Sequence, residues 1–369
     1  MCKKQYSIKT TGMKKYLWMV TITLVMILTG CSKDDAESPA KKDYFPSWNK
    51  CEALTLLQEY VEDVTNPKSP NFISVEDRIA TFDMDGTLLG ELSPSYFEYS
   101  LFDYRVLEDP SYKDQAPEDV VEAAKIVRNY ICYGTELPDH FDMQHGRAQA
   151  KAFAGMTIAE FDAYIKTFAA RPANGFTGMT YSQSFYRPML EVFEYLQEND
   201  FTNYVISGSD RFVCRALVGP LGIAPNRVIG MDVKLKSSEQ GEEAGVNYNM
   251  GQEEYLIRTD ELILKAIKNN KVLQISQEIG KVPVLSFGNS SSDCAMHNYC
   301  MSNEKYRGEA FMLVADDDAR DHADLAEAAK REAKWREAGY HIISMRNDFR
   351  TIYGAGVEKV DFYFPSDGE

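Results

Sequence analysis

The stretch "ATFDMDGTLLG", residues 80–90, decides the fold, because an apolar run ends there in two aspartates separated by one residue. Side chains alternate between faces in an extended chain, so Asp83 and Asp85 would point to one side and Met84 to the other. Carboxylates that close repel each other, and one of them should bind a proton unless a cation lies between them. The alternative is an ordinary turn at Asp85-Gly86. The rest of the chain has to distinguish a reactive site from a turn.

Apolar runs of the same kind recur downstream and indicate a parallel sheet. Strands are expected over residues 78–85, 202–209, 282–289, 310–317 and 340–345. Continuous apolar runs followed by helical patterns are typical of strands buried on both faces of such a sheet. Helices are expected over 51–64, 188–200, 261–280 and 324–339, and a β-hairpin over 228–250. The sequence therefore predicts an α/β fold with a Rossmann-like parallel sheet.

The segment between the first two strands has a different pattern. Residues 91–185 contain no convincing buried strand and are rich in helical patterns such as "PEDVVEAAKIVRNYI". This indicates a helical cap domain inserted after the first strand. The expected α/β core then consists of residues 46–90 and 186–369.

Polar residues follow three successive strands at the points where the strands end. They are Asp83, Asp85 and Thr87 after the first strand, Ser207 and Gly208 after the second, and Asn289 and Asp293 after the third. Lys271 lies 18 residues before Asn289, on the helix that leads into the third strand. Ligands of parallel sheets bind at the carboxyl ends of strands near a topological switch point. Each signal alone is ordinary, but their joint order favours a functional site over a turn.

These residues carry a resemblance to a known family. "DMDGTL", "VISGS", Lys271 and "GNSSSD" resemble the four ordered motifs of the haloacid dehalogenase (HAD)-like phosphatases. The helical insert is similar to the smaller cap of phosphoserine-phosphatase-like members, and the resemblance covers residues 76–354. A closer likeness is to a subgroup whose last motif reads "FGNSxGD". Asn289 matches that subgroup, although an aspartate is commoner there in the superfamily, and a serine stands here in place of the subgroup's glycine.

The resemblance implies a role for each site residue. Asp83 would attack phosphorus and form an aspartyl-phosphate, and Asp85 would protonate the leaving oxygen. The phosphoryl group would be held by Thr87, Ser207, Gly208 and Lys271. Mg²⁺ would be bound by Asp83, the backbone carbonyl of Asp85, Asn289 and Asp293, because hard oxygen ligands suit this ion. Such a cation would also relieve the repulsion between the two aspartates.

The expected function is hydrolysis of a small phosphorylated metabolite by a Mg²⁺-dependent phosphomonoesterase. Asp85 favours phosphate esters, since haloacid dehalogenases lack this second acid and a halide leaves without a proton. One alternative is a catalytically silent HAD-like lipoprotein that binds a phosphorylated ligand. Another is a phosphotransferase, which would use the same residues. Glu91 resembles an acidic position that faces a substrate ammonium group in phosphoserine-phosphatase-like enzymes. The alternative is an ordinary linker glutamate.

The N-terminus has the pattern of an export signal. Five lysines precede the apolar run "YLWMVTITLVMILTG" in residues 1–30, and "LTGC" resembles the lipobox of bacterial lipoproteins. Cys31 would then carry the lipid anchor, and residues 31–45 would form a polar tether. The acidic "SKDD" resembles a tag for the outer cell surface, so a lipid-anchored location at the outer membrane is expected. The alternative is an N-terminal anchor that is never cleaved.

Charge and cysteine content exclude two classes of function. Without residues 1–30 the basic residues fall from 40 to 35 against 56 acidic ones, a formal charge of −21. Such a surface repels nucleic acid, so no nucleic-acid partner is expected. No CxxC pair occurs, which argues against a zinc or iron–sulfur site.

Overall fold

A computed structural model describes residues 42–90 and 96–362, and those from Asp43 onward belong to one compact unit. The predicted signal segment, the predicted lipidation site Cys31 and the predicted substrate contact Glu91 lie outside the described residues. In the described part of the chain, no helix combines the length and apolar character that crossing a membrane requires.

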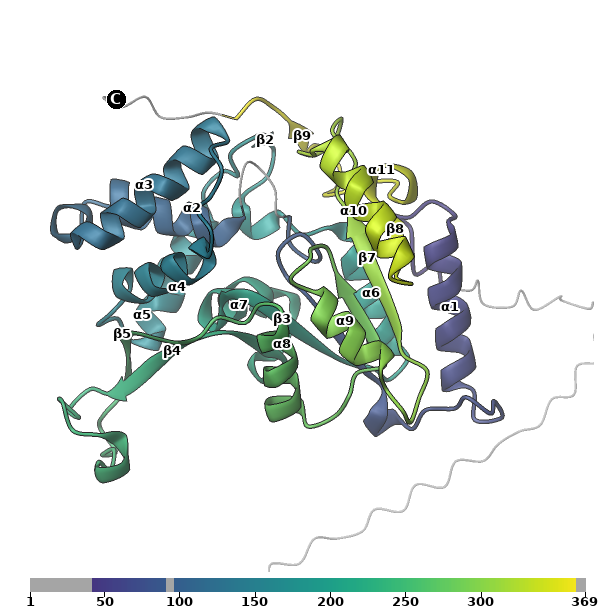
Figure 1. Cartoon of the computed structure of the whole chain (residues 1–369), viewed down its shortest axis with the longest axis horizontal. Helices are drawn as coiled ribbons and strands as arrows, with labels where there is room; N and C mark the ends of the chain where they lie inside the picture. Colours follow the sequence, from purple (N-terminus) through teal and green to yellow (C-terminus); the bar gives the residue numbers. More distant parts are fainter. Residues whose placement is uncertain (1–41, 91–95, 363–369) are drawn as a thin grey trace, which may run out of the picture. The chain divides into compact units, whose positions relative to one another are not determined.

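Helices and strands alternate along most of the chain (Figure 1). The strands are β1 (Ile79–Phe82), β2 (Phe176–Thr177), β3 (Thr202–Asp210), β4 (Val228–Ser237), β5 (Leu256–Leu264), β6 (Leu285–Gly288), β7 (Glu309–Val314), β8 (His341–Ser344) and β9 (Glu358–Lys359). The α-helices are α1 (Glu52–Thr65), α2 (Phe97–Asp103), α3 (Glu118–Tyr133), α4 (Phe141–Ala152), α5 (Ile158–Ala169), α6 (Arg187–Glu198), α7 (Arg211–Val218), α8 (Asn269–Gln274), α9 (Cys294–Met301), α10 (Leu325–Glu337) and α11 (Met345–Asp348).

The main sheet has seven strands in the order β5-β4-β3-β1-β6-β7-β8. All neighbouring strands are parallel except β4 and β5, which are antiparallel. Each of the five predicted strands overlaps a strand of this sheet, so the predicted α/β fold class is confirmed. Strand β1 lies between β3 and β6, where the chain changes direction across the sheet.

Helices cover both faces of the sheet, as the alternation of side chains along β7 shows. Phe311 and Leu313 pack in the cluster that holds the apolar sides of α1 and α6. Ala310 and Met312, on the opposite face, pack with Trp335 of α10. Since successive side chains of a strand point to opposite faces, this alternation defines three layers. Helices α1 and α6 form one outer layer, and α8, α9 and α10 form the other.

Stacked phenylalanines hold the central strands in register. The ring centroids of Phe82 and Phe287 lie 4.4 Å apart, and those of Phe287 and Phe311 lie 5.1 Å apart. The three residues are also paired partners in β1, β6 and β7. The backbone N–H of Asp83 donates to the carbonyl of Phe287 at 2.9 Å. This stack therefore fixes the register of β1 against β6, and with it the position of Asp83 beside the end of β6.

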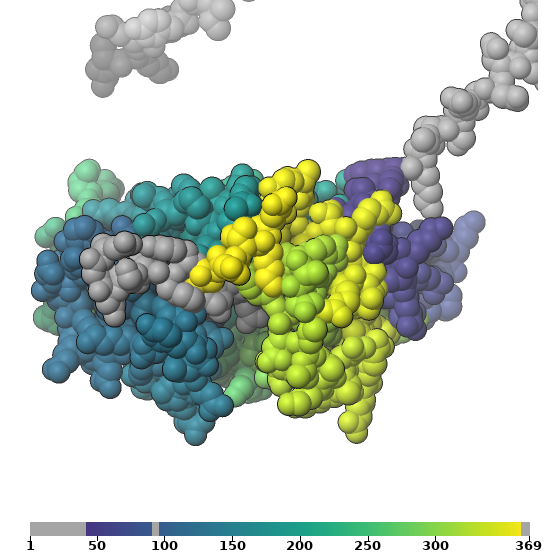
Figure 2. Space-filling model, turned by 90° about the horizontal axis from the view of Figure 1, so that it is seen from above, coloured from purple at the N-terminus to yellow at the C-terminus, as the bar shows by residue number. Residues whose placement is uncertain are grey.

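The described part of the insert, residues 96–184, contains helices α2 to α5 and is called the helical insert below. The chain enters and leaves the insert at neighbouring points of the core, where the N–H of Gly90 donates to the carbonyl of Ser184 at 2.7 Å. The insert packs on the core through α5 against α7 and α4 against β5. Its short strand β2 pairs with β9, and Figure 2 shows the yellow C-terminal segment lying beside the insert.

The predicted helix over residues 261–280 is wrong at its start. Glu261 to Leu264 belong to β5, which pairs with β4, and helix α8 begins only at Asn269. The predicted hairpin over 228–250 is right only in its first strand, β4, because residues 238–250 form no strand and β4 pairs with β5, which begins at Leu256. The sequence "ELILKAIK" fits a helical period, whereas pairing with β4 selects the extended form. Tertiary pairing overrides a local preference here.

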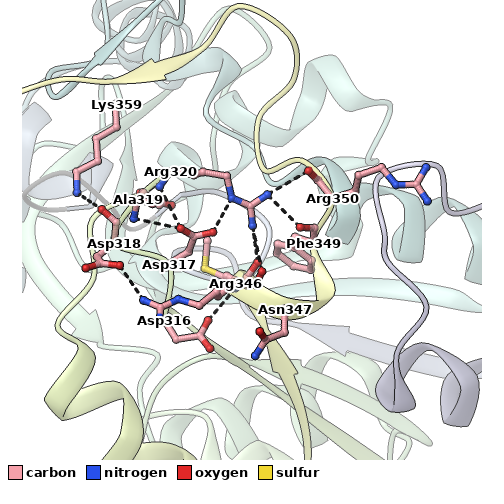
Figure 3. A network of polar contacts seen from close by, with 12 residues as sticks. Asp316, Asp317, Asp318, Ala319, Arg320, Arg346, Asn347, Phe349, Arg350 and Lys359 are labelled. Atoms are coloured by element: carbon pink, nitrogen blue, oxygen red, sulfur yellow. Dashed lines mark hydrogen bonds and ion pairs between the residues drawn. The ribbon is translucent and has the colours of Figure 1, made fainter.

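A polar network joins the segment after β7 to the segment after β8 (Figure 3). The carboxylate of Asp317 accepts from Nε of Arg320 at 2.6 Å. The same guanidinium donates to the backbone carbonyls of Met345, Phe349 and Arg350 at 2.9 to 3.1 Å. Arg320 thereby provides hydrogen-bond donors for backbone carbonyl groups in and just after the short helix α11. These bonds hold the C-terminal part of the core together.

Asp321 lies next to this network, and its burial should make the stability of the fold depend on pH. Burial raises the pKa of Asp321 to about 7, while its carboxylate oxygens accept from the N–H of His322 and the hydroxyl of Tyr353. The folded state therefore holds a proton that the unfolded state releases near pH 4, so stability falls as the pH rises from about 4 to 7. Asp321→Asn cannot ionise, and it should exceed the wild type in stability at pH 8 by up to about 4 kcal/mol. Urea unfolding at pH 5 and pH 8 would measure this.

Asp318→Asn provides the matched control, since that carboxylate is half exposed and lies in the same segment. Its pH dependence should equal that of the wild type. Identical pH dependence in Asp321→Asn and the wild type would contradict a protonated Asp321 in the folded state.

Candidate active site

The sheet brings the polar ends of three strands to one edge. Asp83 follows β1 directly, Ser207 lies in β3, and Asn289 follows β6 directly. Because β1 is the neighbour of both β3 and β6 and all three are parallel, these residues face a common region.

Lys271 joins two of the predicted aspartates. Its ammonium donates to Oδ1 of Asp83, to Oδ1 of Asp293 at 2.7 Å and to the carbonyl of Ile206 at 2.8 Å. An ammonium group has three N–H donors, so these acceptors use all of them. The Lys271 side chain is 1% exposed, and its positive charge forms ion pairs with both carboxylates.

The charges of this group are not fully balanced. Burial and then the neighbouring Asp293 carboxylate raise the pKa of Asp83 well above its usual range, in spite of Lys271. Burial opposes ionisation of Asp293 as well, but Lys271 outweighs it and lowers the pKa of Asp293. The pKa of Lys271 is raised, since the charges of Asp293 and Asp83 exceed the cost of burial. A second cation would therefore be electrostatically favourable at this position.

Two serines hold the other aspartate. Oδ2 of Asp85 accepts from the hydroxyl of Ser209 at 2.8 Å and from that of Ser207 at 3.2 Å. Oδ1 of Asp85 is buried and accepts no hydrogen bond from the described residues. Burial raises the pKa of Asp85, and the two serine hydroxyls oppose this rise. The raised pKa favours the protonated form that a proton donor needs.

The loop after β6 wraps around Asp293. Its Oδ2 accepts from the backbone N–H groups of Asn289 and Ser290 at 3.1 and 3.0 Å. Thr87 donates to Oδ1 of Asn289 at 3.4 Å, which joins the loops after β1 and β6. A β-carbon on Gly288 would lie 2.6 Å from that of Asp293, so only glycine allows this tight turn.

A cavity of about 320 Å³ opens above these residues. Its walls come from the strand ends, from the helical insert and from the segment after β5. The lining residues are Asp83, Asp85, Tyr96, Asp142, Gly208, Ser209, Lys265, Ile267, Lys268, Asn289 and Ser290 to Ser292. The cavity suits a small polar ligand.

The structure brings together Asp83, Asp85, Thr87, Ser207, Gly208, Lys271, Asn289 and Asp293, all of which the sequence predicts as site residues. Their chemical roles remain predictions. Lys271 and Ser207, expected to hold phosphoryl oxygens, contact carboxylates in this structure.

The cavity lining also includes residues that the sequence analysis did not name as site residues, among them Ser209 and Lys265. Ser209 lies two residues after Ser207, and the alternation of side chains in β3 would have placed both on one side. No comparable pattern marks Lys265, because the sequence predicts that it belongs to a helix over residues 261–280.

The predicted metal ligands offer oxygen atoms. The side chains are Asp83, Asp293 and Asn289, with the carbonyl of Asp85 as the fourth group. Among the described residues no three His, Cys, Asp or Glu side chains cluster around a metal position. A set of two carboxylates, an amide and a carbonyl still fits the oxygen preference of Mg²⁺, which usually retains several waters.

Comparisons with known proteins support the fold of the chain. No family model matches the chain, and neither does any curated protein. A solved structure of a conserved protein of unknown function from Anaerococcus prevotii DSM 20548 is 14% identical, with a TM-score of 0.51 over 84% of this chain and 98% of that one. This likeness concerns the fold alone.

Two other solved structures resemble the chain less well. Cytosolic 5′-nucleotidase IIIB bound to cytidine is 12% identical, with a TM-score of 0.46 over 82% of this chain and 88% of that one. A HAD family hydrolase from Salmonella enterica serovar Typhi is 13% identical, with a TM-score of 0.39 over 74% of this chain and 69% of that one.

Proposed function

We propose that the protein is a Mg²⁺-dependent phosphomonoesterase of the HAD-like type, acting on a small phosphorylated metabolite. One observation carries this proposal. A carboxylate held by a buried lysine and a second carboxylate held by two serines line the same cavity, two residues apart. The motif order in the sequence agrees with this geometry.

Asp83 would act as the nucleophile. Lys271 holds its Oδ1, while Oδ2 accepts no hydrogen bond from the part of the chain that the structure describes. Attack by Oδ2 on phosphorus would form an aspartyl-phosphate and release the alcohol. Lys271 would keep the carboxylate oriented through this step.

Asp85 would move the protons. In the first step it would give its proton to the departing ester oxygen, and in the second it would accept one from the attacking water. Ser207 and Ser209 would orient its carboxyl group toward the cavity.

Asp83, Asn289, Asp293 and the carbonyl of Asp85 would hold Mg²⁺. When bound, the ion would neutralise charge on the transferring phosphoryl group. The N–H groups of Asn289 and Ser290 hold Oδ2 of Asp293 in place for this task.

The test is phosphate release by the soluble form, residues 32–369, from a panel of small phosphomonoesters with and without Mg²⁺. Release that requires Mg²⁺ would support the enzyme. A folded protein that binds Mg²⁺ but hydrolyses no ester would support the silent ligand-binding lipoprotein. Transfer of phosphate to an added alcohol would indicate a phosphotransferase. Anchoring through Cys31 is part of the proposal, and radiolabelled palmitate incorporation by wild type and Cys31→Ser would test it.

Ser209→Ala should impair proton donation selectively. We expect roughly a tenfold loss of kcat for an alkyl phosphate, whose alcohol needs a proton to leave, because one hydrogen bond that orients the carboxyl group of Asp85 is lost. The loss for p-nitrophenyl phosphate should be smaller, since nitrophenolate leaves without a proton. Steady-state kinetics on both esters would measure the difference, and an equal loss on both would contradict the positioning role.

A further inference from the structure

The cavity is lined by two lysines that the proposed mechanism does not use. They are Lys265 and Lys268, whereas Lys271 is not among the lining residues. Lys268 is exposed at the rim, but Lys265 is only 3% exposed. A buried ammonium group is costly unless its donors and its charge are satisfied.

Lys265 has hydrogen-bond donors to spare. Its ammonium contacts one acceptor among the described residues, Oε2 of Glu98, at 3.5 Å. That distance is long for a hydrogen bond between charged groups. Lys271, by contrast, has three acceptors within hydrogen-bond distance. The remaining N–H groups of Lys265 therefore have no protein acceptor in the described chain, while its side chain borders the cavity.

Neighbouring elements hold the lysine in this place. A β-carbon on Gly146 would lie 3.5 Å from Cδ of Lys265, so the stem packs directly on helix α4. Glu98, on α2, is itself fixed by the N–H of Asp210 at 2.6 Å. Residues of both the insert and the core thus hold the ammonium group in place. Ordering a charged side chain costs conformational entropy, and a binding group that is already ordered avoids this cost when its ligand binds.

We propose that Lys265 binds an anionic oxygen of the substrate in this cavity, and this inference rests on the proposed phosphatase function. The oxygen could belong to the transferring phosphoryl group or to a carboxylate on the leaving group. Both sources share the same chemistry, a small oxyanion that accepts the free N–H groups of Lys265. Asp83, Asp85 and Asp142 are the acidic residues that line the cavity, so a cation among them favours the binding of an anion there.

The first experiment measures binding without turnover. Inorganic phosphate would be titrated calorimetrically into the soluble form with Mg²⁺ present. Lys265→Met should weaken binding roughly 10- to 100-fold, the effect of one hydrogen bond to a charged group, and Lys265→Arg should retain part of it. Lys330→Met, an exposed lysine of α10, should bind like the wild type.

Folding is controlled by a second variant. Lys265→Met leaves Glu98 buried without its cation, so the double variant Lys265→Met/Glu98→Gln removes both charges and keeps an acceptor for Asp210. It should fold as the wild type does and bind phosphate as weakly as the single variant.

The second experiment separates the two sources. The KM of Lys265→Met would be measured for an ester with a carboxylate on its leaving group and for a similar ester without one. A rise in KM for both, with weaker phosphate binding, assigns the lysine to the phosphoryl group. A rise only for the carboxylate ester, with phosphate binding unchanged, assigns it to the leaving group.

The inference and the proposed function can fail separately. Unchanged phosphate binding and unchanged KM in Lys265→Met would overturn the inference and leave the phosphatase intact. Phosphate binding that depends on Lys265, without hydrolysis of any ester, would overturn only the enzyme. Neither binding nor hydrolysis by the wild type would overturn both.

Discussion

Asp83→Asn is expected to reduce phosphate release roughly 10⁴- to 10⁶-fold, the loss typical of removing a catalytic nucleophile. An amide oxygen is a weak nucleophile, and without the carboxylate no aspartyl-phosphate can form. The fold should persist, because the amide oxygen can still accept from Lys271 and the backbone N–H bonded to Phe287 is unchanged. Single-turnover and steady-state phosphate release on the preferred ester would measure the loss.

Asp162→Asn is a suitable control, since this half-exposed carboxylate of α5 pairs with Lys166 at the surface. Its activity should equal that of the wild type. If Asp83→Asn retained more than about a tenth of the wild-type rate, attack would have to be assigned to another group.

Lys271→Met is expected to destabilise the fold as well as abolish activity. The substitution removes the cation between Asp83 and Asp293 and leaves two carboxylates unpaired in the interior. Breaking a buried ion pair from one side usually costs about 3 to 5 kcal/mol, because the remaining charge keeps its desolvation penalty. Urea unfolding, with the slope checked against the wild type, would give the change in unfolding free energy.

A second substitution distinguishes charge from packing. In Lys271→Met/Asp293→Asn one of the two stranded carboxylates is neutral, so part of the lost stability should return while activity stays absent. Lys330→Met tests the same side-chain change on the surface. If the single Lys271 variant unfolded at the wild-type urea concentration, the ion pairs would contribute nothing to the folded state.

The strand ends could be predicted because each is marked by a local pattern. The run before Asp83 and the run before Asn289 are continuous and apolar, and both strands lie at the centre of the sheet. Parallel strands align their carboxyl ends, so residues more than 200 positions apart were expected together, and Thr87 indeed reaches Asn289.

The parts that could not be predicted depend on long-range pairing. Strand β5 is extended because β4 pairs with it, and nothing in "ELILKAIK" records that partner. Lys265 enters the cavity only because the chain leaves that strand there. Ser209 was missed for a different reason: the predicted strand over residues 202–209 already places Ser207 and Ser209 on one side, but only the structure shows that both hydroxyls reach Asp85.

The hydrogen bond between Gly90 and Ser184 has a consequence for how such a protein can diverge. A segment whose ends already touch acts on the core as a closed loop, and the entropy of closing it grows only with the logarithm of its length. Doubling that length would cost about 0.6 kcal/mol. The insert residues that line the cavity, Tyr96 and Asp142, can therefore be replaced as a block, while the sheet that carries Asp83 keeps its geometry. For the proposed phosphatase, substrate choice and reaction chemistry would then be free to evolve at different rates in one chain.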